Sequence, residues 1–326
     1  MNNLNNDTKK SMFSRVMTAI VLVIICVPCL FAGSWYFLAL SFAALALAIH
    51  EFTNAPAHNH YNLAIHGFIF VMTMATVYWI FIKWNVNAVG WNLDLWRFEN
   101  GLTSIEVSTI GIATIVSVLF LTSILDKNFT INDATYLFTM IVFVGLSFQA
   151  ILFLRYFPRF AFATENLPVS DIPWWHASFL IIYVLLGTFM SDIGAYFVGV
   201  LFGRNKMNPR ISPKKTWEGF AGGVVLSLVM SVSFALIVDR LGYPMLPFMT
   251  SKQWYWIVGI SVIMPFMANL GDFLFSAIKR NFNLKDYGTL LKGMGGVLDR
   301  LDSVLMVSLT VAIIIIFIHN GWSLWV

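Results

Sequence analysis

Long hydrophobic runs separated by short polar stretches make up most of this chain. A helix needs roughly 20 apolar residues to cross a bilayer, and about nine runs approach or exceed that length. They lie near residues 14–32, 34–50, 62–82, 105–125, 133–154, 176–201, 217–238, 254–275 and 303–322. A transmembrane barrel would instead show short segments of alternating polarity. The pattern predicts an all-α polytopic membrane protein with about nine transmembrane helices.

Composition agrees with a membrane protein. Hydrophobic residues make up 59% of the chain and charged residues 11%, with a mean hydropathy of +0.77. Soluble domains carry roughly twice that charged fraction. Positive charge precedes the first run, as in a signal peptide, but this run is long enough to span and another follows at once. We therefore expect a retained first helix.

The distribution of Lys and Arg predicts the orientation. With nine crossings and a cytoplasmic N-terminus, most basic residues lie in the N-terminal segment and in the loops on the cytoplasmic side. This is the asymmetry that the positive-inside rule describes. We expect the two most basic loops, and with them the active site, to face the cytoplasm. The absence of a long polar N-terminal extension favours a bacterial inner (cytoplasmic) membrane over that of an organelle.

Two groups of potential ligands or redox residues have simpler interpretations. Cys26 and Cys29 lie within the first run, without the βαβ context of a redox motif, and are interpreted as small lipid-facing residues. A second group surrounds the loop after the second run: His50, Glu51, His58 and His60. Its spacing matches no zinc pattern well, so a polar interfacial loop is favoured over a metal site.

A charged segment, residues 276–303, separates the last two runs. Its sequence is SAIKRNFNLKDYGTLLKGMGGVLDRLDS, and Asp272 lies just before it. Charged groups so close to a bilayer cost free energy and indicate a functional site. Glycines stand between its basic and acidic halves, and they allow a close approach of the backbone to a ligand: Gly293, Gly295 and Gly296.

The acidic residues of this region predict a magnesium site. Asp299 and Asp302 share a face if the chain is helical, and Asp272 ends the preceding run. Clustered carboxylates repel one another unless a hard cation such as Mg²⁺ binds them. We expect Asp272, Asp299 and Asp302 to bind one or two Mg²⁺ ions, with a monovalent cation as an additional candidate. The alternative is that Arg280 and Arg300 neutralise these carboxylates.

The basic residues predict phosphate binding. Ser276, Lys279 and Arg280 follow Asp272 on one helical face, an arrangement that suits an anionic substrate carrying Mg²⁺. The alternative is a helix anchored to anionic lipid by its basic residues. A second basic loop, residues 191–219, begins with Asp192 inside an apolar run. Its phosphate-binding candidates are Ser212, Lys214, Lys215 and Thr216. P-loop spacing is absent, and the alternative is a loop that only sets topology.

The charged segment resembles the signature of the phosphatidate cytidylyltransferase (CDP-diacylglycerol synthase) family. That signature reads S-x-hydrophobic-K-R, four residues, K-D, a later H-G-G, and D-R-hydrophobic-D. The matching residues are Ser276, Lys279, Arg280, Lys285, Asp286, Gly295, Gly296, Asp299, Arg300 and Asp302. The segments ISPKKTWEG and SDIGAY are also similar to that family, so the specific resemblance covers about residues 192–303. It departs at Lys292 and Met294, where members have proline and histidine.

The resemblance implies a reaction of CTP with phosphatidate that gives CDP-diacylglycerol and pyrophosphate in phospholipid biosynthesis. The implied catalytic residues are Asp272, Lys279, Arg280, Asp299, Arg300 and Asp302. The implied substrate-binding residues are Asp192, Ser212, Lys214, Lys215, Thr216, Ser276, Lys285, Asp286, Gly295 and Gly296. Residues 1–175 would form a scaffold and residues 176–326 the catalytic region. The expected partners are CTP, phosphatidate and a second copy in a homodimer, without nucleic acid.

Alternative functions remain at this point. A nucleotidyltransferase acting on another lipid phosphate is compatible with the change at Met294. A transporter of an anionic solute would place charges along a path and show repeated halves, whereas the charge here gathers on one side. The D-G-x-x-A-R motif of CDP-alcohol phosphotransferases is absent from the sequence.

Overall fold

Helices dominate the computed structural model. It describes residues 6–56, 61–85, 90–93, 102, 104–163, 173, 175–290 and 295–321, with 6–13, 82–85 and 90–93 described by their backbone only. The α-helices are α1 (Asn6–Ala32), α2 (Ser34–Asn54), α3 (Leu63–Tyr78), α5 (Thr109–Leu125), α6 (Ile131–Ala163), α7 (Phe179–Phe202), α8 (Trp217–Arg240), α9 (Trp254–Asn281) and α10 (Leu298–His319). Short 3₁₀ helices are η1 (Trp79–Phe81), η3 (His176–Ser178) and η4 (Ser251–Gln253). The predicted all-α class is confirmed.

Eight helices in the described residues are long and apolar enough to cross a membrane, and α5 is a shorter apolar helix of 17 residues. Together they account for the predicted runs. Several helices extend beyond them; for example, α6 has 33 residues, and α9 continues to Asn281. The extension of α9 matters for the site, because Lys279 and Arg280 form its last turn rather than a loop.

Two β-hairpins interrupt the helical pattern. Strands β1 (Ile82–Asn85) and β2 (Gly90–Leu93) pair antiparallel, as do β3 (Lys206–Asn208) and β4 (Ser212–Thr216). In the second hairpin, Lys206 pairs with Thr216. The basic loop is therefore ordered by backbone hydrogen bonds, which the run-length pattern did not predict.

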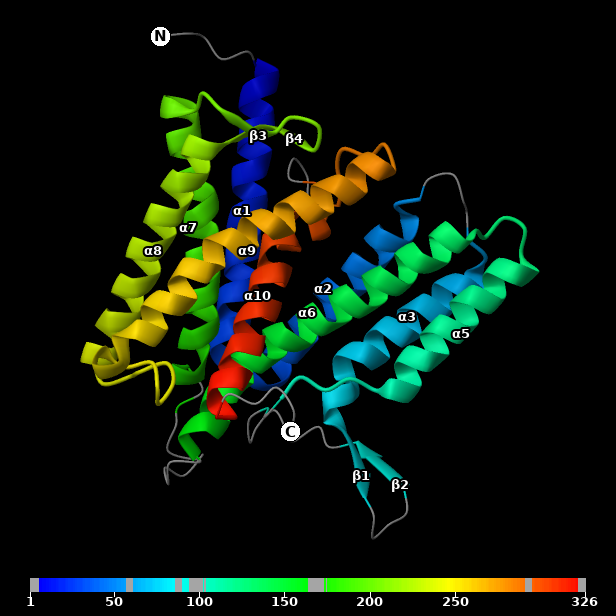
Figure 1. The fold of residues 1–326 in the computed structure, drawn as a ribbon, viewed down its shortest axis with the longest axis horizontal. Coiled ribbons are helices and arrows are strands. Elements are labelled where there is room, and N and C mark those ends of the chain that lie inside the picture. Colours follow the sequence, from blue (N-terminus) through cyan, green and yellow to red (C-terminus); the bar gives the residue numbers. More distant parts are fainter. Residues whose placement is uncertain are drawn as a thin grey trace.

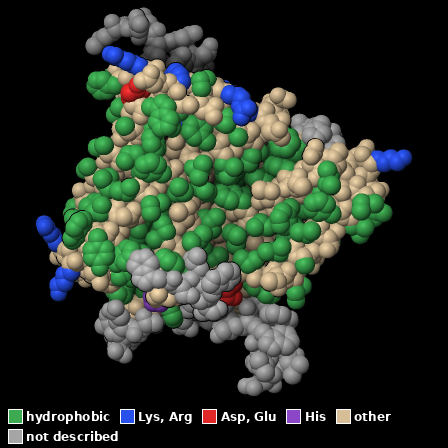
Figure 2. All heavy atoms as spheres, viewed as in Figure 1, with side chains coloured by type: hydrophobic (Ala, Val, Ile, Leu, Met, Phe, Trp, Pro, Cys, Tyr) green, Lys and Arg blue, Asp and Glu red, His purple; other side chains and the backbone are tan. Residues whose placement is uncertain are grey.

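The chain ends lie at opposite ends of the helix bundle. Figure 1 shows the N-terminus and the β3–β4 hairpin at one end, and the C-terminus and the β1–β2 hairpin at the other. Helices α7–α10 gather on one side, and α3, α5 and α6 on the other. Figure 2 shows hydrophobic side chains over most of one face, with visible Lys and Arg side chains at its margins. This distribution suits a protein embedded in lipid.

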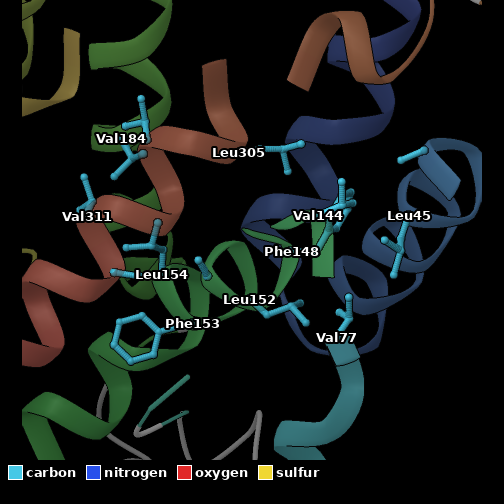
Figure 3. Packing of buried hydrophobic residues seen from close by; sticks show 14 of the residues in the cluster. Leu45, Val77, Val144, Phe148, Leu152, Phe153, Leu154, Val184, Leu305 and Val311 are labelled. Atoms are coloured by element: carbon cyan, nitrogen blue, oxygen red, sulfur yellow. The ribbon is translucent and has the colours of Figure 1, made fainter. Parts of the chain in front are cut away.

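Helix α6 joins the two groups of helices into one core. Figure 3 shows Val144 and Phe148 of α6 on the side of Leu45 and Val77, in the N-terminal region. Leu154 lies on the other side, among residues of the C-terminal helices. The buried hydrophobic cluster thus includes residues from both predicted regions, whose division at residue 175 stays a prediction.

Glycines allow α7 and α8 to pack with their backbones in contact. A Cβ atom at Gly194 would lie 2.7 Å from the carbonyl oxygen of Gly222, and one at Gly223 would lie 2.6 Å from that of Ser191. Small residues drive helix association in membranes because they permit this approach. The contact places Asp192 of α7 close to the start of α8 and to the β3–β4 hairpin.

We expect Gly194→Ala to destabilise the protein by about 1–3 kcal/mol, because the added methyl group would force the two backbones apart. Gly259→Ala in α9 is the matched control, since nothing lies within 4 Å of its Cβ position. Thermal unfolding of both variants in the same detergent measures the difference. Equal midpoints for the two variants would contradict the tight α7–α8 contact.

Candidate active site

A polar cavity of about 500 Å³ lies between α7, the β3–β4 hairpin, the start of α8, and α9. Its polar lining includes Asp192, Lys206, Lys214, Lys215, Asn269 and Asp272. The fold therefore brings together Asp192, the two lysines of the SPKK segment and Asp272, which lie on three separate elements, whereas Ser212 does not line the cavity. Sequence analysis missed Lys206 and Asn269, whose only signals were their positions within the basic loop and one turn before Asp272.

Lys215 connects the hairpin to α9. Its Nζ lies 2.7 Å from Oδ2 of Asp272 and donates to Oδ1 of Asn269 at 2.8 Å. The same ammonium group lies 4.6 Å from the centre of the Phe273 ring. The other oxygen of Asp272 accepts a hydrogen bond from Ser276 at 3.2 Å. These contacts fix the Asp272 side chain at the edge of the cavity.

Three carboxylates interact electrostatically here. Asp192 experiences the charges of Asp272 and Lys215, and Asp302 experiences those of Asp272, Lys279 and Asp192. Close packing of α9 on α10 brings them together, because a Cβ atom at Gly271 would lie 2.7 Å from the carbonyl oxygen of Asp302. The ammonium group of Lys215 offsets part of this negative charge through its ion pair with Asp272. Lys206 and Lys214 add two further positive charges to the cavity lining.

Asp299 occupies a different environment. Its Oδ1 lies 2.8 Å from Nζ of Lys279, and the two side chains are 5% and 10% exposed. Its Oδ2 accepts hydrogen bonds from the backbone N–H groups of Tyr287 and Gly296, at 2.8 and 2.9 Å. Asp299 is thus neutralised, and both of its carboxyl oxygens are hydrogen-bonded. Burial, followed by nearby charges that include Asp299, raises the pKa of Tyr287 above its usual value.

The predicted magnesium ligands are therefore divided between two environments. Asp272 and Asp302 interact across α9 and α10, whereas Asp299 is bonded to Lys279. Among the described residues, no three His, Cys, Asp or Glu side chains form a ready metal-binding group. Sequence spacing placed Asp299 and Asp302 on one helical face but did not reveal the loop that folds back onto Asp299. Magnesium binding stays a prediction.

Other predicted residues have structural partners. Thr216 caps α8 by accepting from the backbone N–H of Gly219 at 3.1 Å, and Ser212 pairs with Asn208 in the hairpin. Arg280 is exposed and donates to the carbonyl oxygen of Leu284 at 3.0 Å. Three further residues are exposed around the same end of α9 and α10: Lys285, Asp286 and Arg300. Their roles toward substrate stay predictions.

Glycine geometry explains part of the motif. Gly295 has a φ of 91°, in the region that favours glycine. The departures at Lys292 and Met294 fall outside the described residues, as do Gly293, His58 and His60. Cys26 and Cys29 are free thiols, as expected of two small residues in a helix.

Comparison with known proteins identifies relatives along nearly the whole chain. The model of the cytidylyltransferase family matches residues 13–318, well beyond the segment that carries the sequence signature. A phosphatidate cytidylyltransferase of Bacillus subtilis (strain 168) is 34% identical over 203 residues, 62% of this chain and 66% of that protein. One from Staphylococcus saprophyticus is 27% identical over 294 residues, 90% of this chain and 95% of that protein. One from Staphylococcus haemolyticus is 28% identical over 297 residues, with the same two shares.

Proposed function

This chain belongs to the cytidylyltransferase family, and we propose that it transfers the cytidylyl group of CTP to phosphatidate, producing CDP-diacylglycerol and pyrophosphate. The observation that carries the proposal is the cavity in which lysines of the β3–β4 hairpin meet Asp192 and Asp272. The three relatives described above are named for this activity. The cavity lies at the end of the bundle that carries the β3–β4 hairpin, where we expect a water-soluble nucleotide and a membrane lipid to meet.

The reaction requires the approach of two anions. An oxygen of the lipid phosphate forms a bond to the α-phosphorus of CTP, and the bond from that phosphorus to the bridging oxygen of pyrophosphate breaks. No side-chain nucleophile takes part. Lys206, Lys214 and Lys215 line the cavity and would neutralise phosphate oxygens as the two substrates meet. Positioning and charge stabilisation supply most of the rate enhancement in such transfers.

The chemistry of these carboxylates suits a divalent cation, although no three His, Cys, Asp or Glu side chains of the described residues already form a metal-binding group. Asp192, Asp272 and Asp302 interact electrostatically, and oxygen ligands of this kind suit Mg²⁺ bound together with substrate phosphates. We propose that these three residues hold one or two Mg²⁺ ions, which would neutralise the triphosphate when bound. Asp299, which the sequence spacing predicted as a ligand, would act through its contact with Lys279 instead. A monovalent cation stays a further prediction.

Sidedness and assembly belong to the same proposal. Basic residues gather at the end of the bundle that carries β3–β4, and this supports a cytoplasmic location for that end in a bacterial inner membrane. These residues are Arg204, Lys206, Arg210, Lys214, Lys215, Lys279 and Arg280. CTP is then available on the side of the cavity. Homodimer formation stays a prediction.

Removing divalent cations should abolish turnover. We expect EDTA to reduce product formation from CTP and phosphatidate to background, and excess Mg²⁺ to restore it, because the cavity carboxylates would otherwise repel the triphosphate. A matched sample that receives EDTA already saturated with Mg²⁺ controls for effects of the chelator. Full activity in EDTA with no detectable bound divalent metal would contradict the magnesium proposal.

The proposed reaction is tested with purified protein, CTP, Mg²⁺ and phosphatidate in mixed micelles. Mass spectrometry should detect CDP-diacylglycerol, with an equal amount of pyrophosphate, and neither should form when CTP is omitted. Product with a different lipid phosphate but none with phosphatidate would favour the alternative nucleotidyltransferase. Flux of an anionic solute into vesicles without CTP turnover would favour a transporter.

A further inference from the structure

A buried glutamate of the N-terminal region contacts the start of α10. Glu51, near the end of α2, is 5% exposed. Its Oε1 accepts a hydrogen bond from the backbone N–H of Val297 at 2.7 Å, and its Oε2 accepts one from that of Leu298 at 2.8 Å. These residues lie 246 and 247 positions later in the chain. Sequence analysis had grouped Glu51 with His50, His58 and His60 and favoured a polar interfacial loop over a metal site. His50 forms a hydrogen bond with Asn54.

The contact satisfies groups that a helix leaves open. The first N–H groups of a helix have no partner within it, and a carboxylate at this end is favoured by the helix dipole. At the start of α10, Glu51 accepts hydrogen bonds from the backbone N–H groups of Val297 and Leu298, and Asp299 accepts one from that of Gly296. Three successive N–H groups are thereby held by two carboxylates, from α2 and from α10 itself. The first turn of α10 is fixed on both sides.

The loop before α10 is shaped to receive the Glu51 carboxylate. A Cβ atom at Gly296 would lie 2.6 Å from the carboxyl carbon and from each carboxyl oxygen of Glu51. One at Gly288 would lie 2.8 Å from Oε1. Gly295 needs glycine for its positive φ, whereas Gly296 is outside that region and needs glycine for space. The second glycine of the family signature is therefore explained by Glu51.

We propose that Glu51 is a positioning residue of the active site, which sets the first turn of α10 and with it Asp299 and Asp302. This proposal rests on the proposed cytidylyltransferase function. Glu51 does not line the polar cavity; it acts through the backbone of α10, which carries Asp299 against Lys279 and Asp302 toward Asp272. Groups that orient metal-binding or substrate-binding side chains in this way commonly contribute about 10- to 100-fold to activity.

The first test separates positioning from folding. We expect Glu51→Ala to lower kcat by about 10- to 100-fold per folded molecule, and Glu51→Gln to lose less, because its amide oxygen can still accept one N–H. Asp239→Asn is the control, since Asp239 caps a loop at the far end of α8 by accepting from Ser251 at 2.8 Å. If Glu51→Ala lowers only the melting temperature and leaves kcat within about twofold of wild type, the positioning role is overturned.

A second test uses the contact between Glu51 and Gly296. Gly296→Ala should lower kcat in the wild-type background, and it should cost much less in Glu51→Ala, where the methyl group has room. If Glu51→Ala does not fold, the same cycle is measured with Glu51→Asp, whose shorter side chain should relieve most of the steric penalty, and additive effects there would count equally against the proposal. Additive effects of Gly296→Ala and Glu51→Ala, or an unchanged kcat for Gly296→Ala alone, would overturn the proposal.

The two proposals fail separately. A wild-type protein that forms no CDP-diacylglycerol from CTP and phosphatidate would refute the proposed function before any variant is considered. A wild-type protein that forms it, with Glu51→Ala equally fast per folded molecule, would refute only the role of Glu51. Gly67→Ala in α3, with nothing within 4 Å of its Cβ position, controls for added methyl groups in both cases.

Discussion

Asp272→Asn is expected to reduce kcat by about 100-fold or more while the protein still folds. Asp272 lines the cavity, pairs with Lys215 at 2.7 Å, and interacts with Asp192 and Asp302. The substitution keeps the size of the side chain and its capacity to accept from Ser276, but it removes one negative charge from the three interacting carboxylates. Losses of this size follow the removal of one group that stabilises charge in a transition state.

Stability should change little in this variant. The side chains of Lys215 and Asp272 are 23% and 30% exposed, and ion pairs with this access to water typically contribute about 1 kcal/mol or less. Asp239→Asn again serves as the control carboxylate, since it lies at the opposite end of α8. Steady-state rates with CTP and phosphatidate, together with thermal unfolding, give both quantities. Turnover of Asp272→Asn close to that of wild type would refute a catalytic role for this residue.

The sequence was most informative where physical constraints act over whole segments. Run lengths identify the helices because a bilayer requires continuous apolar stretches, and an extension such as that of α9 to Asn281 is invisible to this criterion. The β3–β4 hairpin was missed because its strands are short and mostly polar. Its residues carry no alternating hydrophobic pattern. The two strands are ordered by their pairing with each other and by the contact of Lys215 with α9.

The sequence predicted which residue types form the site better than it predicted which side chains contact one another. Charged residues at two run ends predicted that Asp272 lies near the acidic residues of α10, and Asp302 does interact with Asp272, whereas the ion pair of Lys215 with Asp272 was not predicted. Spacing alone could not distinguish Asp299, which faces Lys279, from Asp302, which interacts with Asp272. Glu51 could not be assigned at all, because its partners are backbone N–H groups and carry no sequence signal.

Lys279→Met is expected to destabilise the protein by about 3–5 kcal/mol, because removing one member of a buried ion pair leaves the other charge uncompensated. The Lys279 and Asp299 side chains are 10% and 5% exposed, and their charged atoms lie 2.8 Å apart. Arg280→Met is the matched control: this neighbouring cation is exposed and donates to the carbonyl oxygen of Leu284, so its loss should cost about 1 kcal/mol or less. Denaturant unfolding in detergent measures both variants.

The double variant Lys279→Met with Asp299→Asn distinguishes an ion pair from a substrate-binding lysine. Removing both charges should recover a large part of the lost stability, since the amide oxygen that Asp299→Asn introduces can still accept from the backbone of Tyr287 or Gly296. Activity should stay low, because the start of α10 loses the ion pair between Asp299 and Lys279 that connects it to α9. If Lys279→Met instead folds as stably as wild type and raises only the KM for CTP, then Lys279 binds the triphosphate directly and its pairing with Asp299 is secondary.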